Sequence, residues 1–216
     1  MSAPWDYIAK VICLGDSGTG KSSLTVRLCE GRFNKTDVTI GVELDSRVVD
    51  VDDGKKIKLQ IWDTAGQEVD LLNDQYRSVT NSYIRNATGA LLVYDITRKD
   101  TLSHVQRWLS DLRNLGEPHI SIVLVGNKCD LADRRQVSTE EAAAWAKENG
   151  INFHVETSAK TGESVERAFV EVAQEIYRNI RDGVYDPRGK NTGLKVKLGT
   201  DSRRTVHRQA DSQCCS

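Results

Sequence analysis

An eight-residue stretch near the start of the chain has the spacing of a phosphate-binding loop. Gly15 to Ser22 reads Gly-Asp-Ser-Gly-Thr-Gly-Lys-Ser and directly follows the apolar run from Val11 to Leu14. A strand that ends at such a loop and continues as a helix aims backbone N–H groups and the positive helix end at one point. Phosphates fit this geometry, with Lys21 at the outer phosphates and the Ser22 hydroxyl near Mg²⁺. The expected phosphate-binding residues are Asp16, Ser17, Gly18, Thr19, Gly20, Lys21, Ser22 and Ser23.

A second polar loop follows the third predicted strand and reads Trp-Asp-Thr-Ala-Gly-Gln-Glu from Trp62 to Glu68. Asp63 is placed to hold the Mg²⁺ shell through water, and Gly66 has no side chain to keep its N–H from a γ-phosphate. Gln67 can orient a water molecule for in-line attack. The expected catalytic residues are Lys21, Gly66 and Gln67.

Two loops near later strand ends predict recognition of the base. Asn-Lys-Cys-Asp at 127–130 places a carboxylate at Asp130, which can accept hydrogen bonds from the adjacent ring N–H and exocyclic NH₂ of guanine. Adenine lacks this donor pair, so the buried groups would be left unpaired. In Glu-Thr-Ser-Ala-Lys at 156–160, the Ala159 N–H can meet the guanine O6. The expected base-binding residues are Asn127, Lys128, Asp130, Ser158, Ala159 and Lys160.

Thr39 lies between the first predicted helix and the second predicted strand, and offers another hydroxyl to a divalent ion. This hydroxyl reaches the ion only if its loop closes over the γ-phosphate. The expected Mg²⁺ ligands are Ser22, Thr39 and Asp63. Together the loops predict a site for GTP or GDP with Mg²⁺, rather than for ATP.

Apolar runs alternate with helical patterns, which predicts a doubly wound α/β fold with a six-stranded, mostly parallel sheet. The predicted strands are 8–14, 42–51, 56–62, 89–95, 120–126 and 152–156. The predicted helices are 21–30, 76–86, 101–115, 139–149 and 163–181. The turn Asp-Asp-Gly at 52–54 makes the second and third strands an antiparallel hairpin. Ser138 and Glu141 form a predicted capping box for the fourth helix. One apolar stripe on the fifth helix is expected to pack in the core and comprises Val165, Phe169, Val172 and Ile176.

Size and composition limit the possible classes. A chain of 216 residues fits one domain of about 150–180 residues plus an extension. The formal net charge of −1 argues against nucleic-acid binding, where a strongly basic face is expected. No apolar run approaches about 18 residues, and the N-terminus lacks a signal-peptide pattern. Cys13, Cys29 and Cys129 have no metal-ligand spacing, which indicates free thiols in a reducing compartment.

Helical and strand patterns end at Asp182, and residues 183–216 are expected to form a flexible tail. From 184 onward, seven basic side chains outnumber three acidic ones, which gives the tail a charge of +4. The tail ends in Cys214, Cys215 and Ser216, so two thiols stand at the end of an extended arm.

With these motifs in this order, the chain resembles a small GTPase of the Ras superfamily and, more narrowly, a Rab of the early-endosome and recycling branch. The narrower resemblance rests on Ile-Gly-Val-Glu-Leu at 40–44, Lys-Leu-Gln-Ile-Trp-Asp at 58–63, Tyr-Arg-Ser-Val-Thr at 76–80 and Leu-Leu-Val-Tyr-Asp-Ile-Thr at 91–97. It covers about residues 8–181. The implied domains are an N-terminal extension at 1–7, a GTPase domain at 8–182 and a basic tail at 183–216.

The resemblance implies a switch that hydrolyses GTP slowly without a GTPase-activating protein (GAP) and recruits effectors during vesicle traffic. Its implied partners are effectors, an exchange factor, a GAP, an escort protein and a GDP-dissociation inhibitor (GDI). The terminal cysteines resemble the geranylgeranylated endings of Rabs, which implies anchoring of Cys214 and Cys215 to the cytoplasmic face of endosomal or Golgi-type membranes. Two lipid chains give stable membrane residence where one gives only reversible binding, and cycling with the cytosol is implied. Two unmodified thiols are the alternative.

The chain departs from the Rab pattern in both switch segments. Six residues, 69–74, look inserted before Gln75, either through an error in the gene model or as a real loop extension. The first switch is one residue short between Thr39 and Phe33, the aromatic residue expected to cover the guanine edge. Leu44 stands where Rabs have a phenylalanine in the effector-binding patch with Trp62 and Tyr83.

These departures keep a second function open, namely a nucleotide-binding scaffold with impaired GTP hydrolysis. A P-loop kinase or ATPase is disfavoured by the Asn-Lys-x-Asp motif and by the lack of an arginine-rich lid. Within the superfamily, the Ras subfamily is disfavoured because Gln213 replaces the cysteine of a C-a-a-X box. Rho relatives would carry a helical insert before position 138, and Arf relatives a glycine in place of Ser2.

Overall fold

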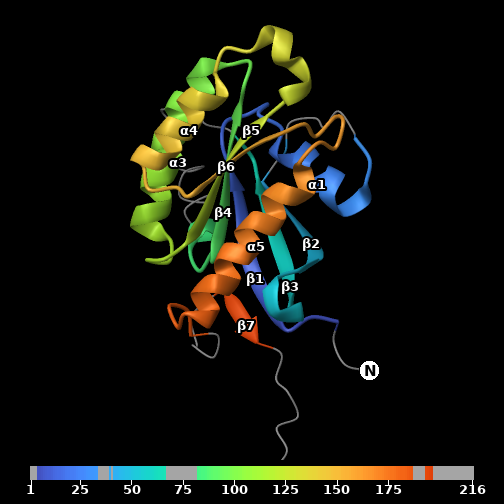
Figure 1. The fold of residues 1–216 in the computed structure, drawn as a ribbon, viewed down its shortest axis with the longest axis vertical. Helices are drawn as coiled ribbons and strands as arrows, with labels where there is room; N and C mark the ends of the chain where they lie inside the picture. The colour runs from blue at the N-terminus through green and yellow to red at the C-terminus, as the bar shows by residue number, and fades with distance from the viewer. Residues whose placement is uncertain (1–3, 34–38, 40, 67–81, 187–192, 197–216) are drawn as a thin grey trace, which may run out of the picture.

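The computed structural model describes residues 4–33, 39, 41–66, 82–186 and 193–196. Its centre is a sheet in which six strands follow the order β2-β3-β1-β4-β5-β6 (Figure 1). These strands are β1 (Tyr7–Leu14), β2 (Val42–Asp50), β3 (Lys56–Thr64), β4 (Gly89–Asp95), β5 (Ser121–Asn127) and β6 (Phe153–Thr157). Every pairing along this order is parallel except that of β2 with β3. The predicted doubly wound fold is confirmed.

Helices cover both faces of the sheet (Figure 1). On one face lie α1 (Lys21–Glu30) and α5 (Val165–Arg181), and on the other α3 (Lys99–Leu115) and α4 (Thr139–Glu148). Successive residues of β1 enter opposite cores, because side chains of a strand alternate between its faces. Val11 and Cys13 join the first core, whereas Ile12 and Leu14 join the second. The predicted stripe on α5 is buried in the first core.

The predicted hairpin turn is present between β2 and β3. A short 3₁₀ turn spans Asp52–Gly54, and Asp53 and Gly54 adopt φ angles of 57° and 66°. This left-handed geometry suits Gly and Asp. A second 3₁₀ segment, Cys129–Arg134, follows β5. At α4, the Glu141 N–H donates to Ser138 Oγ over 3.1 Å, whereas the Glu141 carboxylate pairs with Lys99.

Several predicted boundaries are displaced by a few residues. The hydrogen-bonded ladder with β2 carries β3 to Thr64, two residues beyond the prediction. Helix α3 begins at Lys99 rather than 101, and α5 begins at Val165 because Ser164 has a left-handed φ of 52°. The predicted helix at 76–86 lies largely outside the described residues, which show helix only at 82–84.

The prediction that regular structure ends at Asp182 is wrong. Strand β7 (Leu194–Val196) pairs antiparallel with Tyr7–Ala9 of β1, at the lower end of the sheet in Figure 1. Strand β4 pairs with β1 only from Val11 onward, so the earlier part of that β1 edge has room for β7. Leu194 is buried in the first core.

Tyr185 fixes the start of this returning segment. Its side chain is buried, and its hydroxyl donates to the His119 carbonyl at 2.6 Å and lies 3.2 Å from the Thr88 carbonyl. The segment therefore belongs to the folded domain at both Tyr185 and Leu194. Among the described residues, no helix is both long and apolar enough to cross a membrane.

Candidate functional site

The phosphate loop connects β1 to α1 and depends on glycines for its path. A Cβ at Gly15 would lie 2.1 Å from the Val93 carbonyl oxygen, and one at Gly20 would lie 2.3 Å from Asn127 Nδ2. Both glycines also have positive φ angles, 140° and 96°. Helix α1 begins at Lys21, so the unpaired N–H groups of its first turn lie beside the loop. This arrangement can bind a clustered anion.

Lys21 lies inside the curve of the loop and is 4% exposed. Its Nζ donates to the carbonyl oxygens of Gly15 at 2.5 Å and Asp16 at 3.0 Å. Gly66, two residues after β3, approaches Lys21 and the backbone of the phosphate loop. A Cβ there would meet Lys21 Nζ at 2.3 Å and the Ser17 backbone nitrogen at 2.6 Å. Two of the three expected catalytic residues are therefore adjacent, and Gln67 lies outside the described residues.

The three expected Mg²⁺ ligands end around the same loop. Ser22 Oγ and Thr39 Oγ1 lie 2.6 Å apart. Asp63 is 1% exposed, and both of its carboxylate oxygens are buried with no hydrogen-bond partner among the described residues. Burial raises the pKa of Asp63 to about 6, against smaller opposite effects of the nearby Ser22 hydroxyl and Lys21 ammonium.

A buried carboxylate without a donor is costly unless a cation compensates it. Within the described part of the chain, no cluster of three or more His, Cys, Asp or Glu residues could hold a metal. Two hydroxyls and one carboxylate instead give the hard oxygen donors that Mg²⁺ takes, with phosphate and water completing its shell. Ser22, Thr39 and Asp63 therefore fit this ion.

Asn127 connects the predicted base-binding and phosphate-binding loops. Its Nδ2 donates to the Thr19 carbonyl at 2.8 Å, and its Oδ1 accepts from the Ala159 N–H at 3.1 Å. Thr157 Oγ1 also lies 3.3 Å from this oxygen. These bonds join the phosphate loop, the loop after β5 and the loop after β6. Asn127 is 1% exposed, so the bonds are shielded from water.

Asp130 is the carboxylate predicted to read the base, and neighbouring side chains orient it. Ser158 Oγ donates to Asp130 Oδ1 at 2.6 Å, and Lys160 Nζ lies 3.8 Å from Oδ2. The guanidinium of Arg27 on α1 donates to the carbonyl oxygens of Ala159 and Lys160 at 2.9 and 2.6 Å. The loop after β6 is thus attached to the helix that begins at the phosphate loop.

Lys128 and the phosphate loop share a connection that sequence analysis missed. Lys128 Nζ lies 2.6 Å from Oδ2 of Asp95, which is buried at the end of β4. Burial raises the pKa of Asp95, but hydrogen bonds from Lys128 and Thr97 outweigh it and hold this pKa below its usual value. Arg98 lies 3.5 Å from the same carboxylate and donates to the Ser17 carbonyl at 2.9 Å. In the sequence, Asp95 stands at a predicted strand end and inside the 91–97 motif, but neither feature indicates its bond to Lys128.

The remaining residues predicted for the site have fewer contacts with its loops. Gly18 adopts a φ of 73° and Ser23 is buried on α1, whereas Phe33 is 41% exposed after the end of that helix. The predicted lipidation sites, Cys214 and Cys215, lie outside the described residues. Cys13, Cys29 and Cys129 are free thiols.

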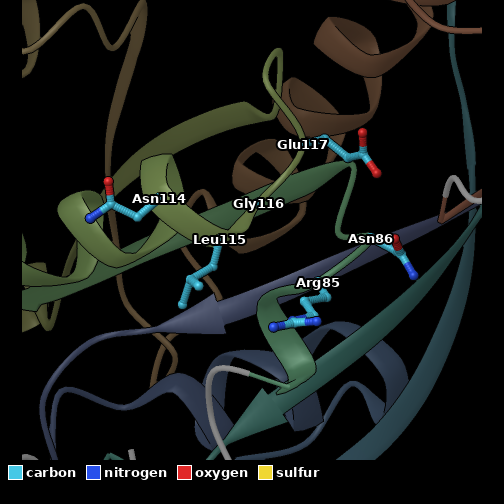
Figure 2. A pocket seen from close by; sticks show the side chains of 6 residues that line it. All are labelled: Arg85, Asn86, Asn114, Leu115, Gly116 and Glu117. Atoms are coloured by element: carbon cyan, nitrogen blue, oxygen red, sulfur yellow. The ribbon is translucent and has the colours of Figure 1, made fainter. Parts of the chain in front are cut away.

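A hollow of about 460 Å³ lies away from these loops (Figure 2). The residues lining it come from the turn before β4 and from the end of α3 and its following loop, and are Arg85, Asn86, Asn114, Leu115, Gly116 and Glu117. The hollow therefore faces the amino ends of β4 and β5. The predicted nucleotide residues gather at the carboxyl ends, where doubly wound sheets bind ligands.

Residues 10–178 match the family model described as the Ras family. The matched stretch spans the phosphate loop, Asp63 and Gly66, and the loops after β5 and β6. It ends inside α5, before the segment that returns to the sheet as β7.

Proposed function

The chain belongs to the Ras family of small GTPases, which bind guanine nucleotide with Mg²⁺ and hydrolyse GTP, and we propose that it acts as a Rab-type switch in vesicle traffic at endosomal membranes. In the GTP state it recruits effectors, and hydrolysis releases them. The observation that carries the nucleotide-dependent part is the buried Asp63 carboxylate, which lies near Ser22 and has no hydrogen bond of ordinary geometry among the described residues, together with the close Ser22 and Thr39 hydroxyls. The endosomal part is supported by the Rab-like motifs of the sequence.

In this proposal Lys21 and the phosphate loop bind the phosphates, and Asp130 with the Ala159 N–H selects guanine. Ser22, Thr39 and Asp63 hold Mg²⁺, which when bound neutralises phosphate charge. Gln67 orients the attacking water and the Gly66 N–H contacts the γ-phosphate. Proximity supports this set, because Lys21 and Gly66 already lie together and Asn127 joins the two binding loops.

We place the effector-binding surface on β2 and β3. Leu44 is 58% exposed and is paired across the ladder with Trp62, whose ring lies 5.5 Å from that of Tyr83. Lys10 Nζ lies 4.4 Å from the centre of the Trp62 ring. An exposed aliphatic residue next to aromatic rings suits an apolar partner surface.

Membrane attachment through Cys214 and Cys215 completes the proposal, together with the exchange factor, GAP, escort protein and GDI that Rabs use. The basic tail adds attraction to an anionic cytoplasmic leaflet. The test replaces both cysteines with serine and follows the tagged full chain by fractionation. The variant should bind GDP normally but become cytosolic, and persistent membrane association would refute the anchor.

Calorimetry of the full chain with Mg²⁺ tests the nucleotide site. GDP and GTP should bind tightly and ATP weakly, and Asp130→Ala should lose most of the guanine affinity. Absence of binding by the folded wild-type protein would reject the site. Effector recruitment is tested by immobilising the GTP-loaded and the GDP-loaded protein on beads and comparing how much Rab effector each captures. Capture should require the GTP-loaded form.

A scaffold with impaired hydrolysis is the second candidate, favoured by the six residues at 69–74 that separate Gln67 from the rest of its segment. Single-turnover decay of bound GTP distinguishes the two functions. A GAP that accelerates decay at least tenfold supports the switch. Tight GTP binding with no decay under the same conditions supports the scaffold.

A further inference from the structure

The carboxylate of Asp16, the second residue of the phosphate loop, is attached to helix α3. Its Oδ2 lies 2.5 Å from His104 Nδ1, and its Oδ1 accepts from Trp108 Nε1 at 3.2 Å. His104 and Trp108 are four residues apart and so share one helix face. Asp16 itself is 7% exposed, which leaves its carboxylate shielded from water by the helix that it contacts.

The backbone of Asp16 is engaged at the same time. Its carbonyl oxygen accepts from Lys21 Nζ at 3.0 Å and from Thr19 Oγ1 at 2.8 Å. A Cβ at Gly66 would lie 2.7 Å from the Asp16 carbonyl carbon. Asp16 therefore connects α3 both to Lys21 and to Gly66 at the start of the segment after β3.

A second connection joins the loop to the start of α3. Arg98, the residue before this helix, donates from NH2 to the Ser17 carbonyl at 2.9 Å. Adjacent loop residues, Asp16 and Ser17, are thus bonded to one rigid element. A loop fixed at two neighbouring positions has less freedom to leave its binding conformation, and holding a catalytic group in place affects rate even at a distance.

We propose that His104 and Trp108 are positioning residues for the nucleotide site, which hold the phosphate loop through Asp16 and thereby slow nucleotide release. The proposal rests on the assignment of the phosphate loop made above. By donating to the Asp16 carboxylate, both side chains also keep this negative charge directed toward α3. A carboxylate free to turn toward a bound diphosphate would repel it.

The test measures dissociation of a fluorescent GDP analogue from the full-length protein with Mg²⁺ present. His104 is partly exposed, so His104→Ala is a variant that should fold. Its release rate should rise about three- to tenfold, the size expected for a lost hydrogen bond to a charged group at a partly exposed site. Trp108→Phe, which keeps a ring but lacks the N–H, should change the rate in the same direction.

A double-mutant cycle separates positioning from general weakening of α3. In an Asp16→Ala background, which keeps the backbone carbonyl, His104→Ala should change the release rate less than twofold. His104→Asn, which keeps a donor near the position of Nδ1, should restore most of the slow release. The matched control is His119→Ala, because His119 is exposed on the loop before β5 and so lies at the amino ends of the strands, away from the phosphate loop.

The outcomes are distinct. An unchanged release rate in His104→Ala, or an equal rise with and without the Asp16 carboxylate, would overturn the inference while leaving the site assignment intact. A fall in melting temperature with equal acceleration in both backgrounds would assign His104 a purely structural role. If the wild-type protein binds no GDP analogue, the assignment of the phosphate loop fails first.

Discussion

Asn127 Nδ2 donates to the Thr19 carbonyl oxygen over 2.8 Å, across 108 positions of sequence. This bond makes the loop after β5 and the phosphate loop one hydrogen-bonded unit. The contact is close enough that Gly20 has no room for a side chain beside Asn127. The loops predicted to bind the base and the phosphates are therefore coupled in the protein itself.

Replacing Asn127 should damage both stability and nucleotide binding. Asn127→Ala leaves the Thr19 carbonyl and the Ala159 N–H without their partner, which we expect to cost about 2–4 kcal/mol of unfolding free energy. Urea unfolding measures this loss. Asn127→Asp keeps an acceptor for Ala159 but places a carboxylate against the Thr19 carbonyl. It should therefore still release GDP faster, and a wild-type release rate would show that the link to Thr19 is unimportant.

Asp63 should destabilise the protein when neither nucleotide nor Mg²⁺ is present. Its pKa is raised to about 6 by burial, above the unfolded value of 3.8. At pH 7 the ionised form is therefore disfavoured in the folded state, by at most about 3 kcal/mol for a shift of this size. Asp63→Asn should raise the unfolding free energy in EDTA, measured with urea, and should weaken the effect of Mg²⁺ on GTP retention.

Asp133→Asn is the matched control, because Asp133 is an exposed carboxylate on the loop after β5. It should change neither stability in EDTA nor the response to Mg²⁺. A loss of stability of Asp63→Asn in EDTA would contradict the prediction, because it would mean that another group stabilises the buried carboxylate. A dependence of GTP retention on Mg²⁺ in Asp63→Asn equal to that of the wild-type protein would exclude Asp63 from the metal site.

The features that sequence predicted are those with local causes. The phosphate loop, the turn at 52–54 and the apolar stripe on α5 each follow from residue type and spacing within one short segment. The parallel sheet followed from the alternation of elements, and its strand ends brought Asp63, Asn127 and Ala159 to one edge. These residues could be assigned together because the topology rule needs no knowledge of side-chain contacts.

The features that sequence missed depend on the register between distant segments. Strand β7 has only three residues in a polar tail, and its place depends on β4 beginning opposite Val11 of β1. The bonds from Asp16 to His104 and Trp108 likewise require the packing of α3 against the sheet. No periodicity in the sequence encodes that His104 rather than Ser103 faces the loop atoms.

The returning segment should contribute to domain stability. Tyr185→Phe removes the hydroxyl that donates to the His119 carbonyl, and should lower the unfolding free energy by about 1–2 kcal/mol. Leu194→Asp places a charge in the first core and should free β7 from β1, which hydrogen exchange at Tyr7–Ala9 would detect. The neighbouring control, Val184→Ala, alters an exposed side chain and should have little effect. Unchanged exchange in Leu194→Asp would show that β7 contributes no protection.

His154 should make the protein less stable as pH falls below about 6.5. Its Nε2 lies 3.0 Å from the Tyr94 hydroxyl, and burial lowers its pKa. In the unfolded chain His154 takes up a proton at about pH 6.5, whereas in the folded protein it is still neutral at that pH. The stability present above this pH is therefore lost as pH falls toward the lower pKa of His154 in the folded protein. Urea unfolding between pH 5 and 8 measures the slope. His154→Gln should flatten it, because glutamine can bond to Tyr94 without titrating. Equal slopes for the wild-type protein and His154→Gln would show that His154 does not cause the loss.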